Sequence, residues 1–486
     1  MMKNGLPCIQ VLVMIYCAVM VSGCTVGPDY KTPVVPVVKT YNAKDEILPT
    51  EQHIAIGKQI QSDWWTLFTS QSLNEVIKQA IADNYEITTA KETLVAAQES
   101  LKAEQGNLFP QVSLDATAGN QKYGVALFGP INFMIPPFTY YEVGPSLSWT
   151  PDLFGKTRRS VERQKALAEY QADELDVAYI TLTSDVVKEV LMIAATKAEI
   201  EAAEQIFVED EKNLVLVQKA FWAGADTKVD ILSSKSQLQS DKTLLPPLQQ
   251  QLSIARHELA ILLGKAPANW IPPDFELKDF ALPKELPVSL PSELVRKRPD
   301  ILAAEANLHA ASAAVGIATA NLYPSITLTG NTLQEALTPG ALFNASSNAW
   351  SVAGTLSAPL FEGGKLTAEK RQAEHAYRAT LAQYQQTILY AFGQVADTLT
   401  ALQHDGEFIA AQQKAFDAAN ASLILARKSY QAGNANLLQI QDAERESAKA
   451  RLDLIKAQSQ RLIDTATLFA VLGGSPYPIS HINQSQ

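Results

Sequence analysis

The sequence lacks excess positive charge, and it also lacks the motifs of common enzymes. Its formal net charge is −11, from 40 basic and 51 acidic side chains, which argues against a nucleic-acid partner. The 6 histidines are scattered without zinc-ligand spacing, and no Gly-x-Ser-x-Gly elbow or dinucleotide fingerprint occurs. The stretch Gly363-Gly364-Lys365-Leu366 departs from a phosphate loop at both ends, because Pro359 and Leu366 occupy the upstream Gly and the Ser/Thr positions. No enzyme activity, metal site or cofactor is therefore expected.

Cysteine is also scarce, and the positions of the 3 cysteines indicate export. Cys8 and Cys17 lie in a segment with Lys3 followed by an apolar run, which is typical of a secretory signal peptide over residues 1–23. Val21-Ser22-Gly23-Cys24 then resembles a bacterial lipobox, in which Cys24 is lipidated and becomes the new N-terminus. A lone exported cysteine has no intramolecular disulfide partner, which favours lipidation over ordinary cleavage beside a chance cysteine.

The residues after Cys24 indicate where the lipid anchor lies. In a lipoprotein retained in the inner membrane, the residue after the lipidated cysteine resembles Asp. This chain has Thr25 at that position, which implies the outer membrane. No apolar run of about 18 residues recurs after the signal, so no membrane-spanning helix is expected.

Glycine and proline are absent from one long stretch. The 68 residues from Lys156 to Ala223 contain neither, and as a helix they would reach roughly 100 Å. Lys365–Ala432 is a second stretch without proline, at a constant offset of 209. A fixed offset predicts an internal duplication, and apolar residues at three- and four-residue steps in both stretches predict the seam of a coiled coil.

Two pairs of short segments have a period of two instead. Val112 and Leu114 alternate with Ser113 and Asp115, and residues 141–150, 325–329 and 350–357 alternate similarly. Each segment has about ten residues with one apolar and one polar face, as in transmembrane barrel strands. A soluble sheet with one covered face remains the alternative. Four strands cannot close a barrel by themselves and open edges cannot lie in lipid, so two or three copies must assemble.

Several motifs together resemble one protein family. They cover nearly the whole mature chain: Cys24-Thr25-Val26-Gly27-Pro28-Asp29-Tyr30, Trp64-Trp65-Thr66-Leu67-Phe68, Leu147-Ser148-Trp149, Asp152-Leu153-Phe154-Gly155, Leu290-Pro291-Ser292-Glu293-Leu294-Val295 and Arg298-Pro299-Asp300-Ile301. On these motifs the chain resembles the outer-membrane factor lipoproteins, the TolC-like (NodT-type) channels of tripartite efflux systems.

The resemblance implies a mainly α fold with a small β part. Three chains would form a twelve-stranded β-barrel that continues into a long periplasmic α-helical barrel. It also implies a homotrimer with a periplasmic adaptor and an inner-membrane pump, and a channel that passively conducts small molecules or drugs across the outer membrane.

The expected layout has two repeats. They follow the signal peptide and a lipidated strap at 24–62, with a Pro-rich linker at 265–291 between them and a tail at 474–486. The first repeat, 63–264, holds a helix, a hairpin at 110–150, a long helix at 156–223 and a helix at 226–264 that Pro246-Pro247 should kink or break. The second, 292–473, holds a helix, a hairpin at 324–360 and helices at 365–432 and 437–472. The external loops are expected at 124–140 and 331–349.

The resemblance also implies a gate at the far ends of the long helices, where the turns at Gly224 and Gly433 are expected. Leu438 would form an apolar ring and Asp442 an acidic ring, while Arg445 would hold helices closed. Asp230 matches an acidic position of the family. The alternative is that Asp442 and Arg445 form a solvated i,i+3 pair worth about 0.2–0.5 kcal/mol.

Two other functions remain open from the residues alone. Similar tubes serve as exit ducts of protein secretion systems, and a poreless lipid-anchored coiled-coil scaffold would need the alternating segments to be soluble hairpins.

Overall fold

The computed structural model describes residues 25–34, 38, 40–41, 52–58, 60–122 and 136–474. The expected signal peptide, the predicted lipidation site Cys24, most of the loop 124–140 and all of the tail except Gly474 lie outside these residues. The chain divides into two compact units: unit 1 comprises Met1–Pro33, Leu94–Tyr170 and Ala304–Tyr384, and unit 2 comprises Val34–Thr93, Gln171–Ala303 and Gln385–Gln486.

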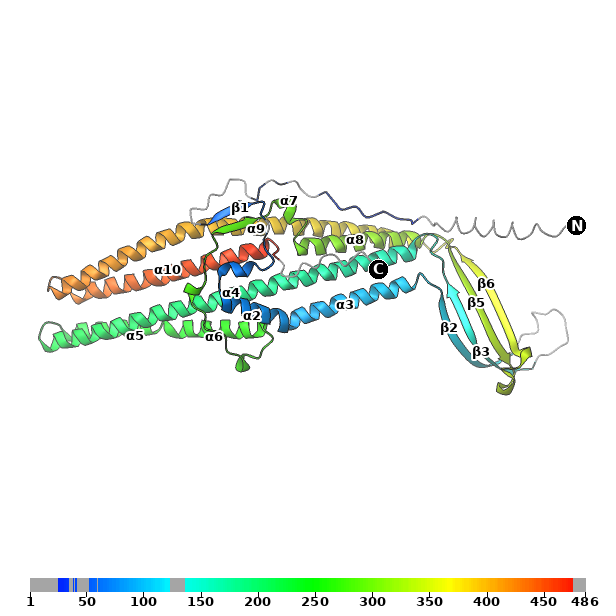
Figure 1. Cartoon of the computed structure of the whole chain (residues 1–486), viewed down its shortest axis with the longest axis horizontal. Helices are drawn as coiled ribbons and strands as arrows, with labels where there is room; N and C mark the ends of the chain where they lie inside the picture. The colour runs from blue at the N-terminus through cyan, green and yellow to red at the C-terminus, as the bar shows by residue number, and fades with distance from the viewer. Residues whose placement is uncertain are drawn as a thin grey trace. The chain divides into compact units, whose positions relative to one another are not determined.

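Unit 1 contains an antiparallel sheet of four strands in the order β2-β3-β5-β6 (Figure 1). The strands are β2 (Gln111–Gln121), β3 (Phe138–Trp149), β5 (Ser325–Ala336) and β6 (Asn348–Ser357). The ladder between β2 and β3 places Val112 opposite Leu147 and Ser113 opposite Ser146. Because side chains alternate along a strand, apolar partners share one face and polar partners share the other.

The connection between β5 and β6 is shorter than the expected loop at 331–349. β5 continues to Ala336, since Glu335 pairs with Glu142 of β3 and Gln334 with Val143. The remaining connection holds two short 3-10 turns, η5 (Pro339–Ala341) and η6 (Ala345–Ser347). The alternation fades after Asn331 because both faces carry polar residues there, so the sequence pattern missed the end of the strand.

Two helices of 67 residues each, α4 (Lys156–Trp222) and α9 (Lys365–Gln431), run from unit 1 into unit 2. Neither contains proline, so every interior amide can donate to the helix. Both end one residue before the expected boundary. Two shorter helices, α3 (Tyr85–Gly106) and α8 (Pro299–Ala320), also contribute to both units.

Three expected helices are each divided in the structure, and of these divisions only the one beside Pro246-Pro247 was predicted. The first is interrupted at Asn84, between α2 (Gln71–Asp83) and α3, because the Asn84 side chain accepts hydrogen bonds from the amides of Glu86 and Ile87 at 2.7 and 3.0 Å. Such side-chain acceptors compete with the helical backbone. The second and third divisions involve prolines.

The helix expected at 226–264 is α5 (Lys228–Lys242) followed by α6 (Leu245–Leu262). Pro246 and Pro247 lie in the first turn of α6, where a missing amide is tolerated. The helix expected from Ser292 is α7 (Pro291–Leu294) followed by α8, which begins at Pro299. A residue that precedes proline is disfavoured in the helical region, so the chain leaves the helix before Pro299.

The last helix is α10 (Leu437–Val471). Among the residues that the structure describes, α8 is the one helix long and apolar enough to cross a membrane, with a mean hydropathy of 1.3 and half of that stretch buried. Buried core helices pass the same test of length and composition, so the expectation that no helix spans the membrane stays a prediction. Alanine-rich turns raise the hydropathy of α8 without a long run of large apolar side chains.

Unit 2 also contains a two-stranded parallel sheet that the sequence did not predict. β1 (His53–Ile56) lies in the expected strap and pairs with β4 (Glu285–Val288) in the expected linker. Both strands have four residues, too few for a clear period. Two 3-10 turns, η3 (Pro267–Asn269) and η4 (Leu277–Asp279), precede β4.

The core of unit 2 contains an aromatic cluster. Trp64 and Phe68, from the 3-10 turn η1 (Trp64–Phe68), and Phe469 of α10 are fully buried. The ring centres of Trp64 and Phe469 lie 5.5 Å apart, and those of Phe68 and Phe469 lie 6.3 Å apart. These contacts hold the segment after the strap against the last helix of the chain.

Candidate functional site

The turns after α4 and α9 have the same local construction. Gly224 and Gly433 have φ angles of +76° and +74°, which glycine adopts without a steric penalty. After each glycine, the next amide reaches back to the last helical turn: Ala225 donates to the Ala220 carbonyl at 2.9 Å and Asn434 to the Ser429 carbonyl at 2.8 Å. This arrangement satisfies helix-end carbonyls and reverses the chain.

Each returning helix begins with a reciprocal cap. Thr227 and Asp230 cap each other at the start of α5, and Asn436 and Gln439 do so at the start of α10. The Asp230 carboxylate accepts from the Thr227 hydroxyl at 2.6 Å and from the Thr227 amide at 2.8 Å. These bonds lower the pKa of Asp230 below its usual value. Asp230 therefore has a structural partner within its own turn.

The predicted gate residues of α10 lie on its exposed surface. Leu438 is 60% exposed. Asp442 and Arg445 form an ion pair at 2.8 Å, with side chains 51% and 56% exposed. The structure thus brings Asp442 and Arg445 together within one helix, while the hydrogen bonds of Asp230 go to Thr227 at the start of α5. An exposed pair of this kind contributes about 0.2–0.5 kcal/mol to the helix.

Polar contacts that the sequence did not predict join α4–α5, the first hairpin, to α9–α10, the second hairpin. The Tyr430 hydroxyl donates to Asp226 at 3.3 Å, and the Gln441 amide donates to the Ser234 hydroxyl at 2.7 Å. Each pair is separated by more than 200 residues along the chain. These residues could have been identified from the sequence only if it were known that the two turns lie close together.

Arg427 of α9 links the two hairpins through ion pairs. Its guanidinium forms ion pairs with Glu209 of α4 and, at 3.0 Å, with Glu444 of α10. Asn213 of α4 also donates to Glu444. Burial works against the charged form, yet the hydrogen bonds to Glu209 and Glu444 hold the pKa of Arg427 above its usual value. Charge-assisted bonds of this kind stabilise more than neutral ones.

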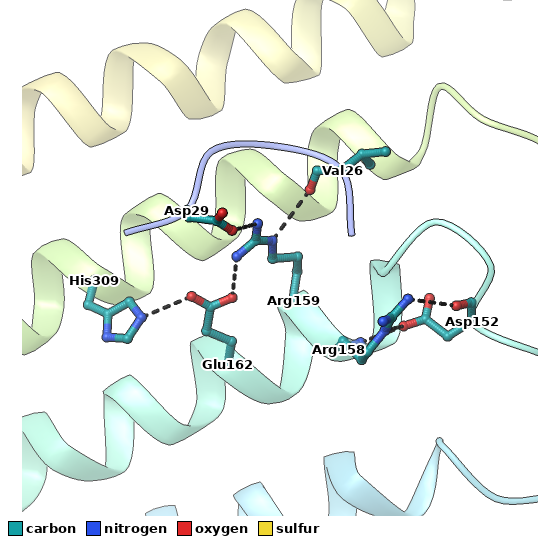
Figure 2. Close-up of polar contacts among 7 residues, drawn as sticks. All are labelled: Val26, Asp29, Asp152, Arg158, Arg159, Glu162 and His309. Atoms are coloured by element: carbon teal, nitrogen blue, oxygen red, sulfur yellow. Dashed lines mark hydrogen bonds and ion pairs between the residues drawn. The ribbon is translucent and has the colours of Figure 1, made fainter. Parts of the chain in front are cut away.

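In unit 1 the start of the strap is held by a second polar network, shown in Figure 2. Arg159 of α4, whose side chain is 5% exposed, pairs with Asp29 at 2.6 Å and with Glu162 at 2.7 Å. His309 of α8 contacts Glu162 at 2.9 Å, and its ring stacks on that of Tyr30 at 4.4 Å. The strap is therefore fastened to both α4 and α8 just after the predicted lipidation site.

Close backbone contact in the same network requires glycine. Gly27 has a φ angle of +92°, and a Cβ atom at this position would lie 2.5 Å from the Gly316 Cα. The amide of Val26 donates to the Phe154 carbonyl at 3.1 Å, where the chain passes from β3 into α4. The Gly-Pro-Asp-Tyr motif of the strap thus has a physical role in docking.

The two faces of the sheet differ in chemistry. Large apolar side chains on one face are 68–78% exposed: Val112, Leu114, Trp350, Val352 and Leu356. The opposite face carries polar contacts, including Ser146 to Asp115 at 2.6 Å and Ser113 to Ser146 at 2.7 Å. A sheet that exposes apolar side chains in this way fits an apolar environment.

Among the residues of the described ranges, no group of three or more His, Cys, Asp or Glu side chains is arranged to hold a metal ion.

The combination of an alternating sheet with very long helices matches one class of proteins. A family model described as "Outer membrane efflux protein" matches residues 76–265 and 290–474. The chain belongs to this family, and it is an outer-membrane efflux protein.

Individual relatives cover almost the entire chain. The "Cation efflux system protein CusC" of Escherichia coli K12 is 27% identical over 463 residues, covering 94% of this chain and 97% of the relative. The "Outer membrane protein OprJ" of Pseudomonas aeruginosa is 28% identical over 464 residues, covering 94% of each. The "Nodulation protein T" of Rhizobium leguminosarum bv. trifolii is 25% identical over 471 residues, covering 95% of this chain and 96% of the relative.

Solved structures share the fold over the same extent. The outer-membrane channel OprN has a TM-score of 0.85 at 28% identity, covering 93% of this chain and 99% of its own. The open state of the Neisseria gonorrhoeae MtrE outer membrane channel has a TM-score of 0.81 at 26% identity, covering 93% and 98%. The chain therefore has the TolC-like fold and is located in the outer membrane.

Proposed function

We propose that three copies of this chain form a passive efflux channel through the outer membrane. The observation that carries the proposal is the four-stranded sheet, whose edge strands are β2 and β6. An open edge cannot lie in lipid, and four strands cannot close a barrel. Pairing β6 of one copy with β2 of the next would close the sheet, and three copies would form a barrel of twelve strands.

Two tandem repeats would build each third of the channel. α4 and α9 have equal lengths and start 209 residues apart, 365 − 156. The caps at Thr227 and Asn436 are also 209 residues apart, 436 − 227. A duplicated unit accounts for both coincidences.

The helical turns would form the periplasmic entrance. In the trimer, Leu438 and Asp442 would face the channel axis as an apolar and an acidic ring, and Arg445 would hold neighbouring helices closed. Asp230 would add negative charge, although its contacts with Thr227 give it a capping role as well. An acidic ring of this kind favours cations over anions.

The energy for transport would come from partner proteins. The relative SilC of Salmonella typhimurium is named a probable outer membrane lipoprotein, and TtgI of Pseudomonas putida is named a toluene efflux pump outer membrane protein. By analogy, Cys24 would carry the lipid anchor, and a periplasmic adaptor with an inner-membrane pump would complete a tripartite system. The relatives' names range from cations to toluene at 27% identity, so similarity does not single out a cargo.

Native mass spectrometry of the detergent-purified protein would test the assembly. We expect three copies, each beginning at a lipidated Cys24. Monomers or dimers as the main species of protein extracted from the outer membrane would contradict the proposal.

A further inference from the structure

Unit 2 contains a buried acidic side chain outside the proposed gate. Asp210 of α4 is 7% exposed. Its Oδ2 atom receives no hydrogen bond from any residue in the described part of the chain. An ionised carboxylate is costly to bury without a donor. A neutral carboxyl group at this position avoids that cost, because its proton can be donated to a neighbouring acceptor.

Asp241 of α5 supplies that acceptor. The Gln237 side chain donates to Asp241 Oδ2 at 2.8 Å and holds this carboxyl group in place on α5. Burial, followed by the hydrogen bond and the charge of Asp241, raises the pKa of Asp210 to about 8. Two neighbouring carboxyl groups that are partly buried repel each other when both are ionised. The pair therefore keeps one shared proton more readily than it carries two negative charges.

The charged groups around this pair come from all four helices of the two hairpins. Glu209 of α4 and Glu444 of α10 face Asp210, and both add to the rise of its pKa. Both also bind Arg427 of α9. On α5, Lys242 beside Asp241 is paired with Glu211 of α4 at 3.0 Å. Arg427 therefore pairs with two of the four acidic groups gathered here, Glu209 and Glu444, while Asp210 and Asp241 are the other two.

We propose that a proton shared by Asp210 and Asp241 stabilises the closed packing of the first hairpin against the second, so that opening of the channel depends on pH. The inference rests on the proposed function, in which these hairpins separate when the channel opens. Loss of the proton places a second negative charge beside Glu209 and Glu444. That charge opposes the ion pairs of Arg427 that link the hairpins.

The direction of the effect follows from proton linkage. Opening returns Asp210 to water and moves Glu444 away, so the open state binds the proton less tightly than the closed state. Asp241 stays beside Asp210 in the first hairpin, so the pKa in the open state lies above the ordinary aspartate value of about 4. The closed state is lost progressively as pH rises from that open-state pKa toward the pKa of about 8 in the closed packing. The ratio of open to closed channels should rise by up to about tenfold per pH unit and level off above about pH 8.

Single-channel recording of the full-length protein in planar bilayers would test this proposal. The open fraction would be measured from pH 5 to pH 9 for the wild type, Asp210→Asn and Glu446→Gln. Glu446 is an exposed acid on α10, so its substitution controls for a general loss of negative charge. We expect the open fraction to rise with pH in the wild type and in Glu446→Gln, and to stay nearly constant and low in Asp210→Asn.

A second measurement separates this proposal from the channel itself. The infrared difference spectrum between the wild type and Asp210→Asn at pH 7 should contain the band of a protonated carboxyl group, which should vanish at pH 10. Absence of that band, or an equal pH response in Asp210→Asn and the wild type, would overturn the proposal. If intact trimers conduct nothing at any pH, the proposed function fails, and the infrared band then decides only whether the shared proton exists.

Discussion

Arg159 is the residue that fastens the strap to the helices of unit 1. Its buried guanidinium bonds Asp29 and Glu162, and its Nε atom lies 3.4 Å from the Val26 carbonyl. We expect Arg159→Met to destabilise the docked strap by about 1–3 kcal/mol, since the bonds of its guanidinium to the charged Asp29 and Glu162 are lost.

Limited proteolysis within residues 25–34 and thermal unfolding would measure this effect. Lys165→Met is the matched control, because Lys165 on the same helix makes a 3.9 Å pair with Glu169 in which both side chains are exposed. The control should change stability by less than about 0.5 kcal/mol. Equal effects of the two substitutions would show that Arg159 does not hold the strap.

Asp405 of α9 should make stability depend on pH. Its Oδ2 atom is buried without a hydrogen-bond donor among the described residues. Burial, and then the charge and hydrogen bond of Asp464, raise the pKa of Asp405 to about 7. A carboxyl group whose pKa is raised by folding stabilises the fold below the unfolded pKa of about 4, and this contribution is lost as pH rises toward 7.

Asp405→Asn should therefore be more stable than the wild type at pH 8, on the order of 1 kcal/mol after allowance for partial exposure. At pH 4 the two proteins should differ little. Thermal unfolding at both pH values would show this, with Asp417→Asn as a control, since Asp417 is exposed on the same helix. An unchanged pH dependence in Asp405→Asn would refute this assignment.

At the scale of the element, the two faces of β2 should tolerate charge very differently. Leu114 is 74% exposed on the apolar face, while Ser113 lies on the polar face with Ser146. Leu114→Arg should destabilise the membrane-inserted sheet by about 2–4 kcal/mol if it lies near the middle of the bilayer. Ser113→Arg should insert almost as well as the wild type.

Folding into lipid vesicles, followed through the heat-resistant assembled form on gels, would compare these two variants. Equal insertion of both would mean that the sheet does not face lipid. The same result would favour the soluble hairpins of a scaffold.

Element types were predictable wherever local chemistry decides them. The absence of proline predicted the two 67-residue helices, and Gly224 and Gly433 predicted where they end. An apolar period of two predicted the strands. The break at Asn84 comes from hydrogen bonds with the nearby amides of Glu86 and Ile87, a local signal that was overlooked. The pairing of β1 with β4 and the end of β5 depend on partners far away in the chain. A local pattern contains no signal for such contacts.

At the scale of the whole molecule, the motifs identified the family, and the comparison with known proteins confirms it. The gate roles of Leu438, Asp442 and Arg445 came from the resemblance and stay predictions. The i,i+3 contact of Asp442 with Arg445 is readable from one helix, but Arg427, Glu209 and Glu444 come together only because two hairpins meet. The sequence therefore predicts contacts within a helix better than contacts between repeats.

The central claim is that the assembled chain is a channel with a gate at its helical turns. Ion conductance in a planar bilayer tests it directly, with the wild type compared with an Asp442→Ala, Arg445→Ala double variant. We expect small steps in the wild type and steps at least severalfold larger in the variant, because the acidic ring and its arginine partners are removed. Equal steps in both would contradict the assigned gate, and the absence of steps from confirmed trimers would contradict the channel.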